Sequence, residues 1–197
     1  MRPKVSSFER EENVYASRAA LKLDSVAQKL DIRFKGKIVL DVGSSSGGFS
    51  DYALKNGAAK VIAVDKGTNQ MSAKVRLNPK LELHEKTDIR GFKVLVRVDI
   101  LLIDVSFVSL KNILPSLLQN TITKDTQVIA MAKPQFEAKD VKLKNHGVIK
   151  NEHMRREILS ELEVWLRQYF VIVDKADSEV SGSKGNRERF YKLKLIA

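Results

Sequence analysis

The chain has 197 residues and no cysteine, and its 35 lysines and arginines outnumber its 24 aspartates and glutamates to give a net charge of +11. This length suits one domain with a sizeable core, and the lack of cysteine excludes disulfides, thiolate nucleophiles and cysteine-bound metal centres. No stretch approaches the roughly 18 uncharged apolar residues of a membrane span, and the polar N-terminus lacks the apolar core of a signal peptide. We therefore expect a soluble, cytoplasmic protein with no membrane contact. The excess of positive charge favours a polyanionic partner such as nucleic acid. The alternative is that the charge serves only to keep the protein soluble.

Five short apolar runs occupy the middle of the chain, separated by patterns of helical spacing. The runs are aliphatic or β-branched, as strands covered on both faces are, and occupy residues 37–43, 60–67, 81–88, 98–106 and 126–133. Helices are expected between them, at residues 49–56, 70–76 and 109–119. Asn56 and Gly57 predict the C-cap of the first helix.

Two amphipathic helices and two strands complete the pattern. One helix follows Ser17, a predicted N-cap, and the other follows Asn151; their apolar stripes are Ala20, Leu23, Ala27 and Leu30, and Ile158, Leu162, Trp165, Leu166 and Tyr169. Strands at 169–174 and 189–196 should pair antiparallel. The alternation of strand and helix predicts a single α/β domain over residues 1–197, with a doubly wound, mostly parallel sheet of seven strands and an antiparallel last strand.

A glycine-rich loop follows the first expected strand. It reads Gly43-Ser44-Ser45-Ser46-Gly47-Gly48-Phe49 and comes directly after Asp41 and Val42. In doubly wound sheets the ligand lies beyond the carboxyl ends of the strands, where this loop is expected. Ser45 occupies the position at which a dinucleotide fingerprint needs a glycine for close approach to a pyrophosphate, and no Gly-Lys-Ser/Thr sequence follows. The loop therefore disfavours NAD and nucleoside triphosphates.

Acidic residues at successive strand ends favour a ligand without a pyrophosphate. Asp41 precedes the loop, Asp65 ends the second strand and Asp88 ends the third. S-adenosylmethionine fits this set, because Asp65 can accept hydrogen bonds from ribose hydroxyls and Asp88 can meet the adenine amino group. Any one of the three taken alone is more simply a turn or capping aspartate. The predicted cofactor site comprises Asp41, Gly43, Ser44, Ser46, Gly47, Gly48, Phe49, Asp65, Lys66, Asp88, Ile89 and Asp104.

A lysine directly follows the fifth apolar run. Residues 128–132 read VIAMA, and Lys133 and Pro134 come next. An ammonium at the end of a buried strand must reach water or meet partners, because burying it unpaired is very costly. From this stretch alone, a lysine that extends into solvent is the simpler interpretation.

Motifs spread over nearly the whole chain resemble the haemolysin-A-like family of FtsJ-like ribosomal RNA 2′-O-methyltransferases. They are SRAALKL (17–23), LDVGSSSGGFSDYAL (40–54), GAAKVIAVDKG (57–67), IDVSFVSL (103–110), AKPQFE (132–137) and GSKGNRERF (182–190). The resemblance implies a Rossmann-like methyltransferase fold, S-adenosylmethionine as cofactor, and ribosomal RNA or a ribosomal subunit as partner. It also implies a catalytic tetrad of Lys22, Asp104, Lys133 and Glu188.

The chemistry of methyl transfer is consistent with such a set. The sulfonium methyl is already electrophilic, so the enzyme must align a ribose 2′-hydroxyl with it and help that hydroxyl lose its proton. Lys133 serves as a base only when it is neutral; if charged, it would instead stabilise the developing alkoxide, and both roles remain open. Lys22 and Glu188 carry no such signal by themselves, whereas Asp104 at a strand end does.

Several departures and additions accompany the resemblance. Ala19 and Ala20 stand where the family usually has two glycines, and an asparagine is common where Asp88 stands. Family members usually begin with an S4-type RNA-binding domain, so we expect residues 1–16 to be a linker or extension from such a domain. The basic residues that flank the tetrad in sequence are predicted RNA contacts: Arg18, Lys144, Lys184 and Arg187.

The sequence leaves two alternative functions. A non-catalytic RNA-binding or ribosome-assembly protein on the same fold would need basic residues but no buried Asp-Lys pair. A membrane-active haemolysin is disfavoured by the missing membrane span. The three histidines, at positions 84, 146 and 153, lack a metal-binding spacing, so no metal is expected.

Overall fold

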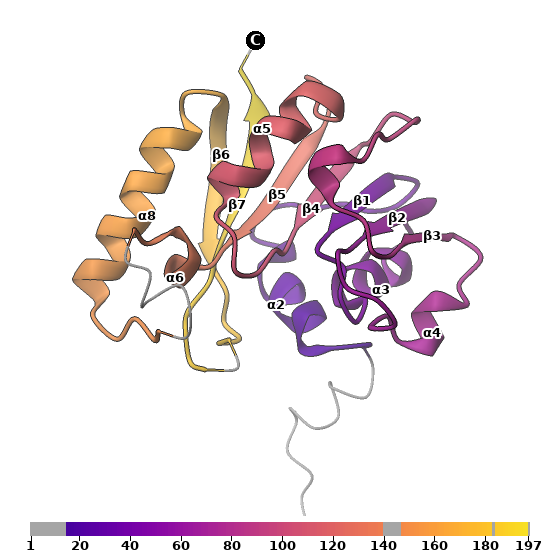
Figure 1. The fold of residues 1–197 in the computed structure, drawn as a ribbon, viewed down its shortest axis with the longest axis horizontal. Helices are drawn as coiled ribbons and strands as arrows, with labels where there is room; N and C mark the ends of the chain where they lie inside the picture. Colours follow the sequence, from indigo (N-terminus) through magenta and orange to yellow (C-terminus); the bar gives the residue numbers. More distant parts are fainter. Residues whose placement is uncertain (1–14, 140–146, 183, 197) are drawn as a thin grey trace, which may run out of the picture.

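The computed structural model describes residues 15–139, 147–182 and 184–196. Its centre is a sheet of seven strands in the order β3-β2-β1-β4-β5-β7-β6. The strands are β1 (Ile38–Val42), β2 (Lys60–Val64), β3 (Leu81–His84), β4 (Ile100–Ile103), β5 (Gln127–Ala132), β6 (Phe170–Asp177) and β7 (Arg189–Leu195). Strands β1 to β5 are parallel to one another, and β7 runs antiparallel to both β5 and β6 (Figure 1). The predicted fold is therefore confirmed.

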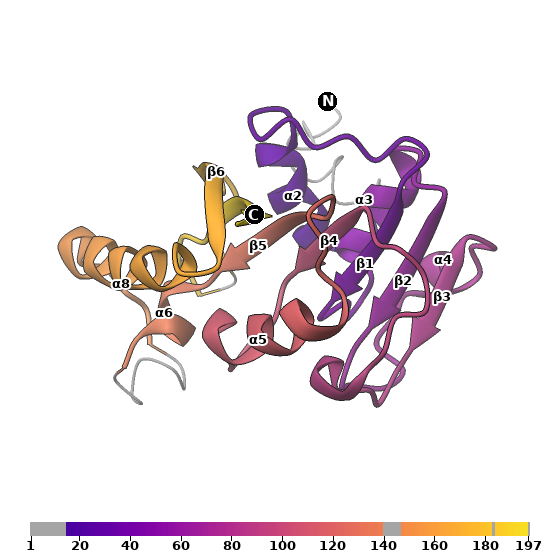
Figure 2. The same ribbon diagram turned by 90° about the horizontal axis from the view of Figure 1, so that it is seen from above.

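Helices cover both faces of the sheet, as Figure 2 shows from above. They are α2 (Arg18–Ala27), α3 (Gly48–Lys55), α4 (Ala73–Arg76), α5 (Leu110–Asn120), α6 (Pro134–Glu137) and α8 (Glu152–Leu166), with a 3-10 turn η1 at Ile89–Gly91. Side chains alternate across β1, so Leu40 and Val42 pack in the core beneath α5 and α8, while Val39 packs in the core beneath α2 and α3. Strands buried on both faces explain the unbroken apolar runs in the sequence.

The chain changes direction across the sheet between β1 and β4. From β1 it proceeds outward through β2 to β3, and then returns to β4 on the other side of β1. The carboxyl ends of β1 and β4 therefore lie side by side with their connections leading away to opposite sides. This switch point is the usual ligand site of doubly wound sheets.

The structure corrects several predicted boundaries and contacts. Strands β2, β3 and β4 end at Val64, His84 and Ile103, so the predicted ranges 60–67, 81–88 and 98–106 were too long, and 70–76 contains only the single turn α4. Ser17 is at the N-cap of α2 but makes no capping hydrogen bond with its side chain. Asn151 does cap α8, through the backbone N–H groups of residues 153 and 154. Tyr169 was predicted on the apolar stripe but is exposed, because α8 ends before it, at Leu166. The buried face of α8 consists of Leu159, Leu162 and Leu166, together with Arg155.

Candidate active site

The glycine loop turns sharply between β1 and α3, directly beside the end of β4. Gly43 has φ +83°, and a Cβ atom there would lie 2.5 Å from the carbonyl oxygen of Asp104. At Gly48, the first residue of α3, a Cβ atom would lie 2.3 Å from Ser17 Oγ, so α2 packs closely on this end of the loop. These two close approaches exclude any larger residue at either position.

A cavity of about 580 Å³ opens beyond the carboxyl ends of β1, β2 and β4. Six of the predicted cofactor residues line it: Gly43, Asp65, Lys66, Asp88, Ile89 and Asp104. Other lining residues were not predicted, and they include Ser45, Gln70, Arg90, Ser106 and Phe107. Ser45 Oγ is 3.1 Å from Gln70 Oε1, and both belong to the wall nearest the loop.

Asp65 and Asp88 are held in different ways at the edge of this cavity. Asp65 accepts hydrogen bonds from the backbone N–H groups of Ser45 (2.8 Å) and Gly67 (2.6 Å). The carboxylate of Asp88 lies 2.6 Å from Arg90 Nη2 and 3.1 Å from Lys66 Nζ. The hydrogen bonds from Arg90 hold the pKa of Asp88 well below its usual range. Asp88 therefore forms ion pairs with two cations. Its contact with an adenine amino group stays a prediction.

The remaining predicted cofactor residues lie behind the cavity wall. Asp41 is fully buried, and Ser50 Oγ donates a hydrogen bond of 2.6 Å to its Oδ2 atom, whereas Oδ1 has no partner among the described residues. Desolvation by burial raises the pKa of Asp41 to about 7. The ring of Phe49 packs against Phe190 in the core. Four residues of the glycine-rich loop do not line the cavity either: Ser44, Ser46, Gly47 and Gly48.

The four predicted tetrad residues form two ion pairs. Lys133 Nζ lies 2.6 Å from Asp104 Oδ1, and Lys22 Nζ lies 2.9 Å from Glu188 Oε1. Their side chains are at most 16% exposed. Lys22 comes from α2, Asp104 follows β4, Lys133 follows β5 and Glu188 precedes β7, so four segments distant in sequence supply the charges. The simpler interpretation of Lys133 as a solvated lysine is wrong.

Local structure explains how Lys133 is held. It occupies the N-cap position of α6, where Pro134 fixes the first turn, and its Nζ atom donates a 2.7 Å hydrogen bond to Ser106 Oγ. Glu137, at the end of the same turn, accepts a 2.8 Å hydrogen bond from the backbone N–H of Leu110 at the start of α5. The turn after β5 and the loop after β4 are thus tied together on both sides of the Lys133–Asp104 pair.

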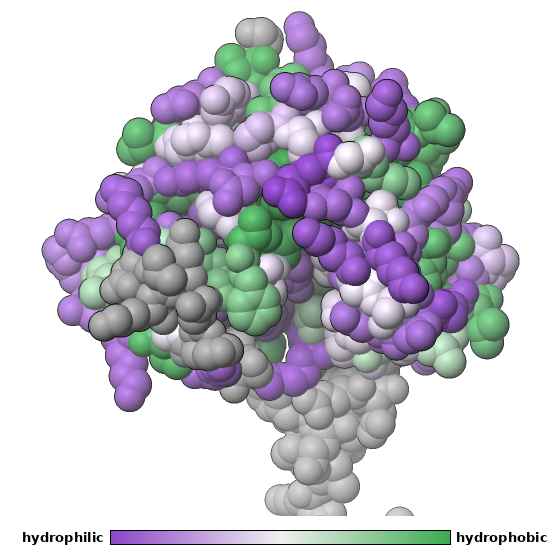
Figure 3. Space-filling view, viewed as in Figure 1, coloured by the Kyte–Doolittle hydropathy of each residue, from purple (hydrophilic) through white to green (hydrophobic). Residues whose placement is uncertain are grey.

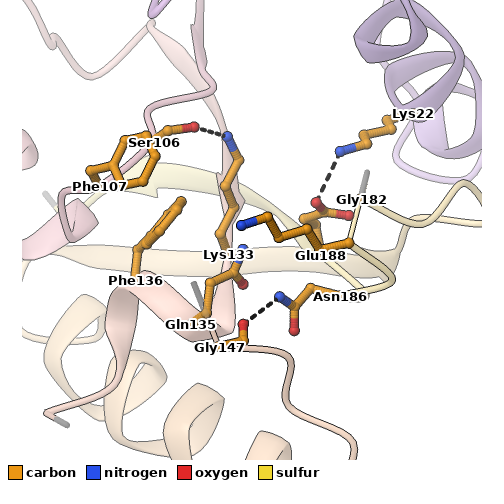
Figure 4. A pocket seen from close by; sticks show the side chains of 11 residues that line it. Lys22, Ser106, Phe107, Lys133, Gln135, Phe136, Gly147, Gly182, Asn186 and Glu188 are labelled. Carbon is orange, nitrogen blue, oxygen red and sulfur yellow. Dashed lines mark hydrogen bonds and ion pairs between the residues drawn. The ribbon is translucent and has the colours of Figure 1, made fainter. Parts of the chain in front are cut away.

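A second cavity, of about 210 Å³, adjoins the first. Lys22, Lys133 and Glu188 line it, and Figure 4 shows Lys22 and Glu188 directed at each other across from Lys133. Ser106 and Phe107 line both cavities. Since Asp104 belongs to the first cavity and its partner Lys133 to the second, the two cavities meet at this ion pair.

Two buried polar residues that the sequence patterns did not single out support the segment before β7. Arg155 on α8 is 3% exposed; its Nε donates to the carbonyl oxygen of Arg187 (3.1 Å) and its Nη2 to Asp177 (2.8 Å). Asn186 donates from Nδ2 to the carbonyl oxygen of Gly147 (2.9 Å). These contacts fix Asn186 and Arg187, the two residues directly before Glu188. Arg155 precedes Leu159 by four residues, so an arginine on an apolar stripe was the available signal.

The predicted RNA contacts lie mainly around the second cavity. Lys184 lines it, and Arg18 Nη2 donates a 3.2 Å hydrogen bond to the carbonyl oxygen of Ser181 in the loop before β7. Arg187, about half exposed, lies 3.5 Å from Asp177. Lys144 falls outside the described residues. Figure 3 shows that hydrophilic side chains cover much of the face seen in Figure 1, with apolar ones scattered among them.

The described part of the chain contains neither a membrane-spanning helix nor a metal-binding cluster. Within residues 15–139, 147–182 and 184–196, no helix is long and apolar enough to cross a membrane. The same ranges contain no group of three or more histidine, cysteine, aspartate or glutamate side chains arranged to hold a metal ion. His146 lies outside them.

Comparisons with known proteins agree with the motifs. The family described as FtsJ-like methyltransferase matches residues 15–195. The "23S rRNA (cytidine-2'-O)-methyltransferase TlyA" of Campylobacter jejuni is 38% identical over 180 residues, which are 90% of this chain and 70% of that protein. The "16S/23S rRNA (cytidine-2'-O)-methyltransferase TlyA" of Mycobacterium tuberculosis is 32% identical over 187 residues, which are 93% of this chain and 69% of that protein.

A solved structure adds the three-dimensional match. A protein of Streptococcus thermophilus, described as a candidate hemolysin, superposes with a TM-score of 0.85 at 32% identity, over 92% of this chain and 67% of that one. The fold, the sequence similarity along the chain and the family match agree with one another, and they confirm the resemblance drawn from the motifs. The chain belongs to the FtsJ-like methyltransferase family, among relatives of the haemolysin-A type.

Proposed function

We propose that this protein transfers the methyl group of S-adenosylmethionine to a ribose 2′-hydroxyl of ribosomal RNA. The observation that carries the proposal is the position of the Lys133–Asp104 ion pair at the junction of two cavities, with Lys22 and Glu188 across the second. A methyl donor in the first cavity and a nucleotide in the second would meet at this pair. Binding RNA without chemistry requires no such buried pairing.

The first cavity suits S-adenosylmethionine on its own features. The bend at Gly43 brings bare backbone against the end of β4, and the pyrophosphate-binding glycine is replaced by Ser45. Asp65 holds its carboxylate at the cavity edge through two backbone N–H groups, and each oxygen retains acceptor capacity for a ribose hydroxyl. When bound, this cofactor supplies an electrophilic methyl group on a sulfonium.

The residues of the second cavity would position and activate the hydroxyl. Lys133 is held by Asp104 and Ser106 so that its nitrogen is fixed where the cavities meet. There it acts on the 2′-hydroxyl, either by taking its proton when neutral or by stabilising the alkoxide when charged. Glu188 holds Lys22 through Oε1, and its buried Oε2 atom has no partner in the described part of the chain, which leaves an acceptor for a ribose hydroxyl. Aligning two substrates in this way can contribute roughly 7–11 kcal/mol to catalysis.

Ribosomal RNA is proposed as substrate from the names of the two relatives and from the charge of this chain. Both names specify cytidine 2′-O-methylation of ribosomal RNA. The net charge of +11 and the basic residues near the second cavity provide phosphate contacts, which position RNA without reading its sequence. Cytidine is accordingly the proposed target nucleoside.

The decisive test is methyl transfer by the purified chain. Ribosomal RNA from cells that lack the gene is incubated with radiolabelled S-adenosylmethionine, digested to nucleosides and analysed for 2′-O-methyl products. The Lys133→Ala variant should lose activity by at least about 100-fold, since a placed acid–base group contributes that much or more, while its cofactor affinity stays near that of the wild type.

The matched control is Lys124→Ala, because Lys124 is an exposed lysine between α5 and β5. It should methylate at the wild-type rate. RNA binding by the wild type without any methyl transfer would contradict the proposal and favour the non-catalytic RNA-binding function.

A further inference from the structure

Gln135 lies in the wall of the second cavity and plays no part in the chemistry proposed above. It is the second residue of α6, two positions after Lys133, and Figure 4 shows it among the labelled residues between Phe136 and the loop that carries Glu188. Its Oε1 atom is buried and has no hydrogen-bond partner among the residues that the structure describes. A buried carbonyl oxygen without a donor costs roughly 1–3 kcal/mol.

The surroundings of Gln135 indicate what would supply the missing donor. The amide of the neighbouring Asn186 is already engaged at both ends, by the carbonyl oxygen of Gly147 and the backbone N–H of Ile149. Among the described side chains of the cavity wall, two buried acceptors therefore remain without a partner, Gln135 Oε1 and Glu188 Oε2. Glu188 belongs with Lys22 and Lys133, where the ribose is proposed to lie, so Gln135 is left for the base.

We propose that Gln135 is a specificity-determining residue that accepts a hydrogen bond from the exocyclic amino group of a cytosine in the second cavity. This inference rests on the proposed function. Cytosine presents an N–H₂ donor where uracil presents a carbonyl oxygen. Uracil would set two acceptors against each other and leave Oε1 unsatisfied, so the same cavity discriminates against it. The aromatic side chains of Phe107 and Phe136, whose ring centroids are 5.0 Å apart, close one side of this space and suit a planar base.

The test measures which nucleoside is methylated rather than only how fast. Wild type, Gln135→Leu, Gln135→Glu and the control Gln119→Leu react with unmodified ribosomal RNA and radiolabelled S-adenosylmethionine, and the products are digested to 2′-O-methylnucleosides. Gln119 is an exposed glutamine on α5. Wild type and control should give 2′-O-methylcytidine at equal rates.

The two variants at position 135 separate recognition from damage. Gln135→Leu should lower cytidine methylation by about 10- to 100-fold, the equivalent of one lost base contact, and lower the ratio of methylated cytidine to methylated uridine. Gln135→Glu keeps an acceptor, so it should keep the cytidine preference even where its rate falls. Cofactor affinity of both variants should match the wild type, because Gln135 does not line the first cavity. Gln135→Leu removes the unpartnered buried oxygen, so this variant should unfold at a temperature no lower than the wild type does.

Failure of this inference can be told from failure of the proposed function. Absence of any 2′-O-methylnucleoside from wild type would overturn the proposed function and this inference with it. A normal rate and cytidine preference in Gln135→Leu would overturn the role of Gln135 alone. Wild-type product consisting mainly of 2′-O-methyluridine would also overturn it, because the amide would then have to offer its N–H₂ group to the base.

Discussion

Asp41 should make the stability of the protein depend on pH in the direction opposite to that of most carboxyl groups. Burial raises its pKa from 3.8 to about 7, against the opposing effect of the hydrogen bond from Ser50. The unfolded chain loses this proton near pH 4 and the folded chain near pH 7, so the folded state binds more protons in between. The free energy of unfolding therefore falls as pH rises through this window. A difference of roughly three pH units, at about 1.4 kcal/mol each, gives a loss of about 4 kcal/mol.

Asp41→Asn removes this titration while nearly preserving shape. Urea denaturation of wild type and variant, followed by circular dichroism at pH values from about 4.5 to 8, gives the free energy of unfolding of each. The variant should gain stability relative to wild type as pH rises, by several kcal/mol in all. Ser50→Ala, which removes the hydrogen bond that favours the charged form, should extend the wild-type decline to higher pH. A difference between Asp41→Asn and wild type that does not change with pH would refute the reasoning, since it would mean that the Asp41 carboxylate is not desolvated.

Three further predictions concern binding and catalysis. Asp65→Ala should weaken S-adenosylmethionine binding by about tenfold or more in calorimetry, because a carboxylate hydrogen bond contributes roughly 1.5–3 kcal/mol. The control Asp125→Ala, at an exposed ion pair, should leave this affinity unchanged. Tighter binding of NAD than of S-adenosylmethionine would contradict the cofactor assignment. Arg155→Gln should lower kcat more than it raises KM, because the segment before Glu188 loses its support. Arg155→Lys should restore little activity, since lysine cannot reach both the carbonyl oxygen of Arg187 and the carboxylate of Asp177. Equal effects on kcat and KM would argue against a positioning role. RNA affinity should be weak and should fall with log[salt] at a slope of about −0.9 per phosphate contact on duplex. Lys184→Ala should reduce that slope by about one contact, and tight, salt-insensitive binding would refute this.

The parts of the fold that sequence alone predicted are those with a local signal. Unbroken apolar runs gave the parallel strands, because burial on both faces removes polar positions, and Asn56 with Gly57 marked the end of α3 correctly. The ends of β2, β3 and β4 were predicted too late, because the predicted ranges included polar residues such as Asp65 and Asp104 that lie just beyond the last residue of the strand. Pairing stops where a neighbouring strand stops, and nothing in the local sequence records that.

The candidate site was predictable only to the extent that motifs named its residues. Lys22 lies off the apolar stripe of α2 and by pattern alone was a solvated lysine, yet it is paired with Glu188, 166 positions away in the chain. Asn186 and Gln135 act through partners or a cavity assembled by tertiary structure, so no spacing along the chain indicates them. Arg155 had one local signal, its position on the apolar stripe of α8, but its partners are distant in the chain. The resemblance supplied the tetrad, and the geometry showed which of those side chains meet.

The position of β7 has a consequence for how the protein reaches its folded state. This last strand, Arg189–Leu195, is inserted between β5 and β6, with which it forms all of its ladder hydrogen bonds. A chain emerging from the ribosome without these residues would have two unpaired strand edges facing each other across a gap, a form prone to mispairing. Glu188 stands immediately before this strand, and its backbone oxygen accepts a hydrogen bond from Ser178 N. The charge that completes the second ion pair is thus set in place only by the final long-range pairing, so prematurely terminated chains would fail in folding and in chemistry at the same step.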